Sequence, residues 1–200
     1  MIRRMTKSIA IALQVAKVGF EKSFFIGETK DSILGYIDCL TKLHNRKAFE
    51  RDKEFLGKDF SLVLVDIDNL KAINDTQGHI SGDKIIQRLA SILTNEAGPL
   101  GRVYRYAGDE FVCLVPREEV ESFCRAIRNE AKKQDAFTVS QGVILYLEQG
   151  MINDALVLAD VTMYRSKKRG KDQITIAPQF FVHGNVKIPL FKNTAVRQMA

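Results

Sequence analysis

The sequence has few cysteines, no long apolar run and no internal repeat, and these absences exclude several classes of protein. Its three cysteines, Cys39, Cys113 and Cys124, show no CxxC spacing and have no neighbouring histidine. This usage is typical of free thiols in a reducing compartment, and we expect a cytoplasmic location. No secretory signal is visible. The apolar stretch 8–20 contains Lys17 and is shorter than the roughly 20 residues of a membrane-spanning helix, so no membrane span is predicted.

The composition is that of a soluble globular protein. Hydrophobic residues make up 46% of the 200 and charged residues 27%. This is enough for one domain with a substantial core and roughly 30–40 residues to spare. The formal net charge of +6 permits binding to polyphosphates, nucleic acid or an anionic membrane surface, and selects none of them.

Helical and strand patterns alternate along the chain and predict an α+β fold. Residues 61–67 form a near-continuous apolar run, which suits a strand buried on both faces. Residues 81–97 repeat apolar side chains at helical spacing. The other predicted elements are a helix within 1–35, a turn and helix at 38–56, strands at 102–106 and 110–115, helices at 117–134 and 151–170, and strands at 137–147 and 173–177. We expect helices packed on one mainly antiparallel sheet, followed by a tail from residue 178 that has the pattern of a small hairpin.

Two acids stand at the end of the predicted central strand. Asp66 ends the apolar run, and Asp68 follows two residues later, on the same face if the chain is extended. A carboxylate in such a place is costly unless it has a partner, and Mg²⁺ is a suitable one because it prefers oxygen ligands. The alternative interpretation is that each acid caps a helix or closes a turn.

The residues after these acids carry groups that suit a nucleotide base. An amide and a carboxylate match the donor groups on the edge of guanine. Taken one by one, residues of these types more often lie in turns or caps. The candidate residues in this stretch are Lys71, Asn74, Asp75, Gly78, His79 and Asp83.

The segment AGDE, residues 107–110, joins the two short predicted strands. Gly108 and Asp109 fit a two-residue hairpin loop with glycine at the first central position. Asp109 and Glu110 would then lie at the hairpin tip and, beside the 61–67 strand, converge with Asp66. Paired carboxylates of this kind hold Mg²⁺ for nucleotidyl transfer. The alternative is a solvated acidic turn.

The predicted helix at 151–170 ends in a basic cluster, YRSKKRGKD at 164–172. Cations at a helix C-terminus are favoured by the helix dipole, so a solvated last turn is one interpretation. The other is a clamp for a triphosphate, made by Lys167 and Lys171.

Taken together, these motifs resemble the GGDEF family, the diguanylate cyclases. The resemblance runs from DCLTKLHNRKAF (38–49) through the acidic and polar block of residues 65–83 and RYAGDEF (105–111) to ADVTMYRSKKRGKD (159–172). It implies a palm-like fold of the nucleotidyl cyclase type. It also implies a reaction in which the 3′-hydroxyl of each of two GTP molecules attacks the α-phosphate of the other, giving cyclic di-GMP and two pyrophosphates. Such chemistry depends on positioning and on charge neutralisation.

The resemblance assigns roles residue by residue. Asp66, the Ile67 carbonyl, Asp109 and Glu110 would hold Mg²⁺ (or Mn²⁺), and the acidic pair, Asp109 first, would also accept the proton. Asn74 and Asp83 would bind guanine, with His79 close by. Lys71 would stabilise charge on the phosphates, and Lys167 and Lys171 would grip the β- and γ-phosphates.

The sequence departs from the family pattern at several positions. Ala107 replaces the first glycine of the signature, next to the turn. Gly98-Pro99-Leu100-Gly101 stands where the family's product-inhibition site reads R-x-x-D, so we predict no feedback through that site. Lys171-Asp172 stands where Arg-Asn is common, which keeps the charge but not the bidentate fork. Gln141 lies where isoleucine is usual.

Three functions are compatible with these observations. An active diguanylate cyclase is preferred, because every matched metal, guanine and phosphate position is filled. A catalytically inactive GTP-binding or partner-binding module and a palm-type cyclase or polymerase with another product are the alternatives. Catalysis would need a homodimer, and a regulatory protein partner is compatible with the sequence; no nucleic-acid partner is expected. We divide the chain into an N-terminal helical segment (1–37) that could supply a dimer contact, the cyclase domain (38–177) and a tail (178–200).

Overall fold

The computed structural model describes residues 35–53, 59–133, 137–145, 147, 150–178, 180–183 and 186–189. Contacts divide the chain into two units, Met1–Tyr36 and Ile37–Ala200, and every helix and strand described belongs to the second. The predicted helix within residues 1–35 lies outside the described residues, apart from residue 35 itself.

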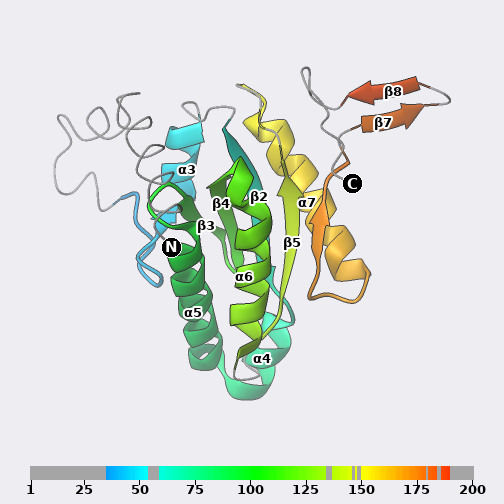
Figure 1. Ribbon diagram of the computed structural model, residues 1–200. Coiled ribbons are helices and arrows are strands. Elements are labelled where there is room, and N and C mark those ends of the chain that lie inside the picture. The colour runs from blue at the N-terminus through cyan, green and yellow to red at the C-terminus, as the bar shows by residue number, and fades with distance from the viewer. Residues whose placement is uncertain are drawn as a thin grey trace, which may run out of the picture. The chain divides into compact units, whose positions relative to one another are not determined.

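A six-stranded sheet forms the centre of the second unit (Figure 1). The three inner pairings, β3–β4, β4–β2 and β2–β5, are antiparallel, whereas the outer pairings β1–β3 and β5–β6 are parallel. The predicted α+β fold with a mainly antiparallel sheet is therefore confirmed. In spatial order the strands are β1 (His44–Asn45), β3 (Arg102–Ala107), β4 (Glu110–Pro116), β2 (Phe60–Ile67), β5 (Val139–Ile144) and β6 (Ile174–Ile176).

Strand β2 is apolar on both faces because helices cover both sides of the sheet. Its Val63 and Val65 belong to the core formed with α5 (His79–Ala97) and α6 (Val120–Lys132). These two helices cross the near side of the sheet in Figure 1, and α7 (Ile152–Lys168) lies behind it. Because strand side chains alternate, Asp66 points to the α7 side.

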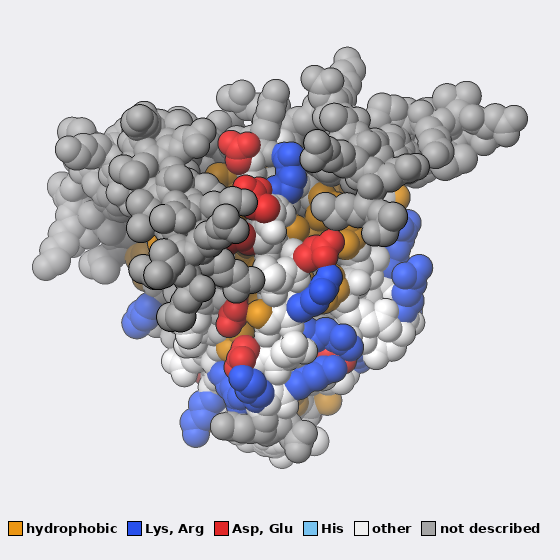
Figure 2. Space-filling view, in the orientation of Figure 1, with side chains coloured by type: hydrophobic (Ala, Val, Ile, Leu, Met, Phe, Trp, Pro, Cys, Tyr) orange, Lys and Arg blue, Asp and Glu red, His pale blue; other side chains and the backbone are white. Residues whose placement is uncertain are grey.

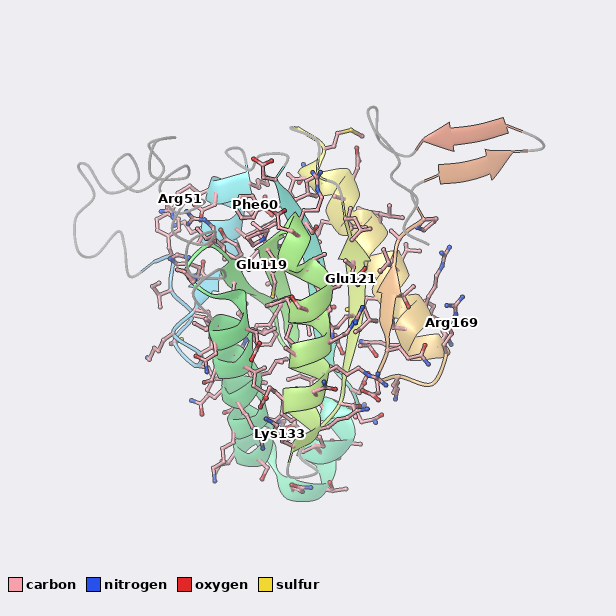
Figure 3. The ribbon with its side chains drawn as sticks, in the orientation of Figure 1. Arg51, Phe60, Glu119, Glu121, Lys133 and Arg169 are labelled. Carbon is pink, nitrogen blue, oxygen red and sulfur yellow. The ribbon has the colours of Figure 1, made fainter. Side chains whose placement is uncertain are left out.

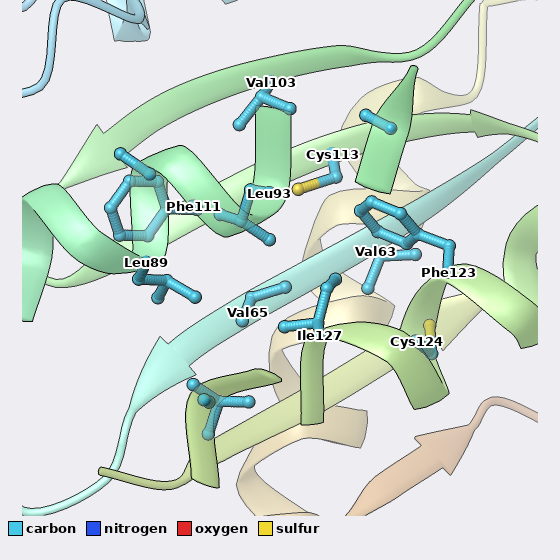
Figure 4. Packing of buried hydrophobic residues seen from close by; sticks show 14 of the residues in the cluster. Val63, Val65, Leu89, Leu93, Val103, Phe111, Cys113, Phe123, Cys124 and Ile127 are labelled. Carbon is cyan, nitrogen blue, oxygen red and sulfur yellow. The ribbon is translucent and has the colours of Figure 1, made fainter. Parts of the chain in front are cut away.

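The larger core lies between the sheet and helices α5 and α6 (Figure 4). Helix α6 buries Val120, Phe123, Cys124, Ile127 and Ala131, the i, i+3, i+4 spacing of an amphipathic helix. The strands contribute β-branched and aromatic side chains that suit a pleated, buried surface. This continuous packing holds in place the end of the sheet at which the functional residues lie.

Helix α7 approaches β5 closely because small residues line the contact. A Cβ added to Gly142 of β5 would lie 2.2 Å from the Ala159 carbonyl oxygen. No larger residue fits there without moving the helix. The close approach matters for function, because α7 carries Lys167.

The structure differs from expectation mainly between residues 70 and 80. A separate helix, α4 (Leu70–Gln77), precedes α5, which begins at His79 rather than at residue 81. Only Leu70 of α4 is buried, so the segment shows little of the apolar periodicity by which helices are predicted. Elsewhere a short helix, α3 (Arg46–Asp52), follows β1, and a 3₁₀ turn, η2 (Arg117–Glu119), precedes α6.

The predicted tail hairpin is present as β7 (Phe180–His183) and β8 (Val186–Pro189), which pair antiparallel. All three cysteines are free thiols, as predicted, and Cys113 and Cys124 are buried. Of the helices in the described part of the chain, none combines the length and apolarity needed to cross a membrane.

Candidate active site

The acidic turn is a tight hairpin between β3 and β4. Ala107 pairs with Glu110, so Gly108 and Asp109 form the two-residue loop. Gly108 has φ +33°, in the left-handed region that glycine adopts without a Cβ clash, whereas Ala107 has a negative φ. The predicted turn is confirmed, and the alanine that replaces the first signature glycine causes no backbone strain.

Strand pairing places Asp66 of β2 directly opposite Glu110 of β4. Asp66 is only 3% exposed. One of its oxygens, Oδ2, forms an ion pair with Lys167 Nζ of α7 at 2.6 Å. The other, Oδ1, is buried and has no hydrogen-bond partner among the described residues.

In this cluster the effects of burial and of neighbouring carboxylates outweigh the effect of Lys167 on Asp66. Burial, then the carboxylates of Asp109 and Glu110, raise the pKa of Asp66 to about 6, although Lys167 opposes the shift. Burial also raises the pKa of Glu110, and the nearby Asp160 and Asp109 carboxylates add to this effect. Like charges that are close together and partly desolvated disfavour ionisation.

These residues fit a divalent cation. Its charge would relieve the repulsion among the carboxylates, and the free Oδ1 of Asp66 is an oxygen ligand of the kind that Mg²⁺ prefers. Among the described residues, no three His, Cys, Asp or Glu side chains surround a single point. A cation here would therefore take Asp66, the Ile67 carbonyl, Asp109 and Glu110 in combination with further oxygens, from water or a bound phosphate, as Mg²⁺ commonly does.

The two lysines of the predicted phosphate clamp reach the same end of β2 from different positions. Lys167 lies in the last turn of α7 and contacts Asp66. Lys171 lies in the turn beyond the helix, and its ammonium group hydrogen-bonds to Asn69 Oδ1, three residues after Asp66. Tertiary structure therefore brings both cations to the end of β2.

The residues predicted to bind the base lie on α4 and α5, directly after β2. Asn74 Oδ1 is buried without a hydrogen-bond partner. It lies over Gly82, where an added Cβ would come within 1.9 Å of it. His79 and Asp83 are exposed in the first turns of α5, and Lys71 is exposed at the start of α4.

Several residues that support the site were not predicted. Arg105 donates to both oxygens of Asp38, at 3.0 and 3.1 Å, and its Nε donates to the Gly108 carbonyl at 2.9 Å. It thereby ties the hairpin turn to the segment before β1. Asp160, whose charge acts on Glu110, stands seven residues before Lys167. Two helical turns separate these residues, and that spacing is the signal by which Asp160 could have been found.

Asp66 and Asp68 have different partners, although the sequence suggested that they share a face. The Asp68 carboxylate is 3% exposed and accepts hydrogen bonds from Thr138 Oγ1 and Ser140 Oγ, both at 2.7 Å. It also accepts one from the Asp172 backbone N–H at 2.9 Å. With its oxygens occupied, Asp68 has a structural role beside the site, and Asp66 alone presents a free oxygen.

Comparison with known proteins identifies relatives of this chain. A family profile described as "Diguanylate cyclase, GGDEF domain" matches residues 35–173. The diguanylate cyclase VdcA of Vibrio cholerae is 32% identical over 154 residues, which cover 68% of this chain and 45% of VdcA. The probable diguanylate cyclase DgcI of Escherichia coli is 36% identical over 146 residues, or 70% of this chain and 33% of DgcI. The chain thus spans less than half the length of these two curated relatives.

Solved structures show the same fold. The coiled coil and GGDEF domain of DgcB from Caulobacter crescentus, in complex with c-di-GMP, matches with a TM-score of 0.64 and 27% identity. That match covers 88% of this chain and 98% of the other. The diguanylate cyclase SiaD of Pseudomonas aeruginosa, solved with its activator SiaC, has a TM-score of 0.64 at 24% identity, covering 88% of this chain and 75% of SiaD.

Proposed function

The chain belongs to the GGDEF family of diguanylate cyclases, and we propose that it condenses two GTP molecules into cyclic di-GMP with release of two pyrophosphates. One observation supports this most directly. Two of the buried side-chain atoms that lack a hydrogen-bond partner in the described part of the chain are Asp66 Oδ1 and Asn74 Oδ1. Such atoms are costly unless a ligand satisfies them. The first suits a metal ion, and the second suits the N–H groups of guanine.

The reaction forms two phosphodiester bonds. In each step the 3′-oxygen of one GTP bonds to the α-phosphorus of the other, the bond from that phosphorus to the bridging oxygen of the β-phosphate breaks, and pyrophosphate leaves. Asp66, the Ile67 carbonyl, Asp109 and Glu110 would hold the divalent cation. When bound, that cation lowers the pKa of the attacking hydroxyl and neutralises charge on the leaving group.

The chain's own residues bind the triphosphate, orient the guanine base and accept the proton. Asp109, with Glu110, takes the proton of the attacking hydroxyl. Lys167, which forms an ion pair with Asp66 in the free protein, would bind the triphosphate of GTP. Lys171 and Lys71 contribute positive charge around the phosphates. Asn74, with Asp83 and His79, orients guanine from the α4–α5 side.

We further propose that the enzyme lacks product inhibition through an R-x-x-D site. The corresponding positions begin and end with Gly98 and Gly101. A Cβ at position 101 would lie 2.6 Å from both the Cβ and the carbonyl oxygen of Ala97. The local packing therefore disfavours an aspartate there, in addition to the absence of both charged residues.

Incubation of the purified protein with GTP and Mg²⁺, followed by chromatography of the products, tests the proposed activity. Cyclic di-GMP and pyrophosphate should accumulate, and the Asp109→Ala variant should produce neither. Added cyclic di-GMP should leave the initial rate unchanged. Absence of product at high protein concentration would refute the proposal.

Ala107 gives the alternative of a non-catalytic GTP-binding module its specific support, because its methyl group stands beside the turn that must approach the substrate. Calorimetric binding of GTP without turnover, with turnover restored in Ala107→Gly, would favour that alternative. An assay with mixed ATP and GTP separates both from a palm-type enzyme with another product.

A further inference from the structure

The turn after α7, which carries Lys171, is held in a conformation that its residues do not favour. Lys171 and Asp172 have φ of +63° and +50°, two successive non-glycine residues in the left-handed region. Such a conformation costs roughly 1–2 kcal/mol per residue and persists only where surrounding contacts stabilise it. Contacts outside the turn must therefore hold it in place.

The first of these contacts comes from α6. Arg128 donates to both oxygens of the Asp172 carboxylate, Nε at 2.9 Å and a terminal nitrogen at 2.8 Å, and Lys132 adds a second cation. Burial alone would raise the pKa of Asp172, but the hydrogen bonds from Arg128 and Lys132 outweigh it and lower the pKa. A planar fork on a carboxylate fixes geometry as well as supplying charge.

The surface near the end of α6 is rich in charged side chains (Figure 2). Figure 2 displays basic side chains gathered over the lower part of α6, with acidic side chains between them. Figure 3 labels Lys133 just beyond the end of α6 and Arg169 just beyond the end of α7. The α6 residues that hold Asp172 are about 40 positions away from it in the sequence.

The second contact comes from Asp68. Its buried carboxylate accepts the Asp172 backbone N–H at 2.9 Å while Thr138 and Ser140 donate to its oxygens. The turn is thus fastened from one side by the Asp172 carboxylate and from the other by its backbone. Between these two points the Lys171 ammonium reaches the end of β2.

We propose that Arg128, Asp172 and Asp68 are positioning residues, which hold the turn so that Lys171 points at the phosphates of the bound nucleotide. The proposal rests on the proposed function, in which Lys171 binds phosphate. It assigns to Arg128, on the outer surface of α6 and remote from the acidic hairpin in sequence, control over nucleotide affinity. It also explains why aspartate at position 172 is useful in this chain, because aspartate pairs with Arg128 and Lys132 where asparagine carries no charge.

A double-mutant cycle in nucleotide binding tests the proposal. The probe is 3′-deoxy-GTP with Mg²⁺, which lacks the attacking hydroxyl, so calorimetry measures binding without turnover. Arg128→Ala should raise the dissociation constant on the order of tenfold, and Arg128→Lys should have an intermediate effect because it keeps the charge but not the fork. In a Lys171→Ala background, Arg128→Ala should add no further loss. Additive losses would overturn the proposal.

The matched control is Arg125→Ala on the same helix. Arg125 forms an exposed ion pair with Glu121, one turn away, and forms no hydrogen bond or ion pair with the described residues of the turn after α7. This variant should leave the dissociation constant within about twofold of the wild-type value.

Hydrogen exchange of the free protein tests whether these contacts hold the turn in place. The backbone amide at position 172 should exchange faster in Arg128→Ala and in Asp172→Ala, and at the wild-type rate in Arg125→Ala. An unchanged exchange rate in the first two variants would refute the claim that the contacts of Asp172 hold the turn. If wild-type protein fails to bind the nucleotide, the proposed function and this role both fail. If it binds and the losses are additive, only the positioning role fails.

Discussion

At the scale of single residues, the site depends on atoms left without partners in the folded chain. Asp66 Oδ1 and Asn74 Oδ1 are buried acceptors that the fold does not satisfy, whereas the neighbouring Asp68 carboxylate is fully engaged. An unsatisfied buried polar group lowers stability, so its presence at a site indicates selection for a ligand rather than for folding. Stability and function should therefore respond in opposite directions when such a residue is changed.

Gly82→Ala should separate folding from nucleotide binding. The new Cβ would come within 1.9 Å of Asn74 Oδ1, and the flexible amide would swing away from its place. Alanine is the better helix former, so the unfolding free energy should stay unchanged or rise by up to about 1 kcal/mol. The KM for GTP should rise at least about tenfold, as expected when an oriented polar contact is lost. Ser91→Ala, on the exposed face of the same helix, serves as the control, and a wild-type KM in Gly82→Ala would contradict the placement of Asn74 at the base.

Asp66→Asn should stabilise the metal-free protein and abolish turnover. Because the pKa of Asp66 is raised to about 6, the folded state holds this proton more tightly than the unfolded state. Its contribution to stability is therefore lost as the pH rises from about 4 to about 6. At pH 8 without divalent cations, urea unfolding of Asp66→Asn should show a gain on the order of 1 kcal/mol. Glu96→Gln, an exposed control on α5, should change stability by less than about 0.5 kcal/mol, and a destabilised Asp66→Asn would contradict the prediction.

At the scale of elements, the hairpin and the helix ends are joined to the rest of the fold by side-chain contacts. Arg105 connects the β3–β4 turn to Asp38, and Thr41 donates to the same carboxylate through its backbone N–H and its hydroxyl. These contacts hold the acidic turn against the segment before β1. The stability of the hairpin should therefore depend on the charge of Asp38.

Lowering the pH should weaken the contacts of Asp38. Burial opposes its ionisation, but hydrogen bonds from Thr41 and Arg105 prevail, so its pKa is lowered on folding. A carboxyl whose pKa is lowered stabilises the fold above its unfolded pKa of about 4, and this stabilisation is lost as the pH falls through the folded pKa. Asp38→Asn should cost roughly 1–2 kcal/mol at pH 7 and less at pH 3, measured by urea unfolding at both pH values. Glu121→Gln, in an exposed ion pair, is the control, and an equal cost at both pH values would contradict the assignment.

Substitution of Gly101, in the connection between α5 and β3, should lower the stability of the protein. An added Cβ would lie 2.6 Å from Ala97 atoms, so Gly101→Ala should cost roughly 1–3 kcal/mol through overpacking. Asn95→Ala, exposed on α5, is the control and should lose less than about 0.5 kcal/mol, measured by thermal and urea unfolding. A Gly101→Ala variant as stable as the wild type would remove the steric argument that position 101 disfavours the aspartate of an R-x-x-D site.

At the scale of the whole molecule, each candidate group comes from a different part of the chain. The acids lie on β2 and the β3–β4 turn, the base-binding residues on α4 and α5, and the lysines at the end of α7. The proposed reaction also requires a second copy, since each GTP supplies the hydroxyl that attacks the other. Turnover per protein molecule should therefore rise with protein concentration until the dimer is saturated.

Deletion of residues 1–30 should lower turnover more than GTP affinity. These residues lie outside those described and outside the matched family region, so the nucleotide contacts remain. The sequence predicts that these residues supply a dimer contact, and without it the effective concentration of two loaded domains would fall. Comparison of kcat at several protein concentrations with the calorimetric affinity for 3′-deoxy-GTP measures both effects. Equal losses of turnover and affinity would contradict the prediction.

Local patterns in the sequence suggested the candidate residues of the site and predicted most of the elements that carry them. Apolar runs and helical spacing predicted β2, α5, α6 and α7, and the glycine of AGDE predicted the two-residue turn, because period and turn chemistry are local properties. The main exception was α4, whose single buried residue leaves little pattern to detect. The two-residue strand β1 was also not predicted.

Only the tertiary structure decided which polar groups meet. It gave Asp66 a free oxygen and Asp68 hydrogen bonds to its oxygens, although the two residues have similar positions in the sequence pattern. It placed Asn74 over Gly82 and joined Asp172 to Arg128. These contacts depend on how closely helices pack on the sheet, as Gly142 allows for α7, and this distance is not encoded in any local period of the sequence.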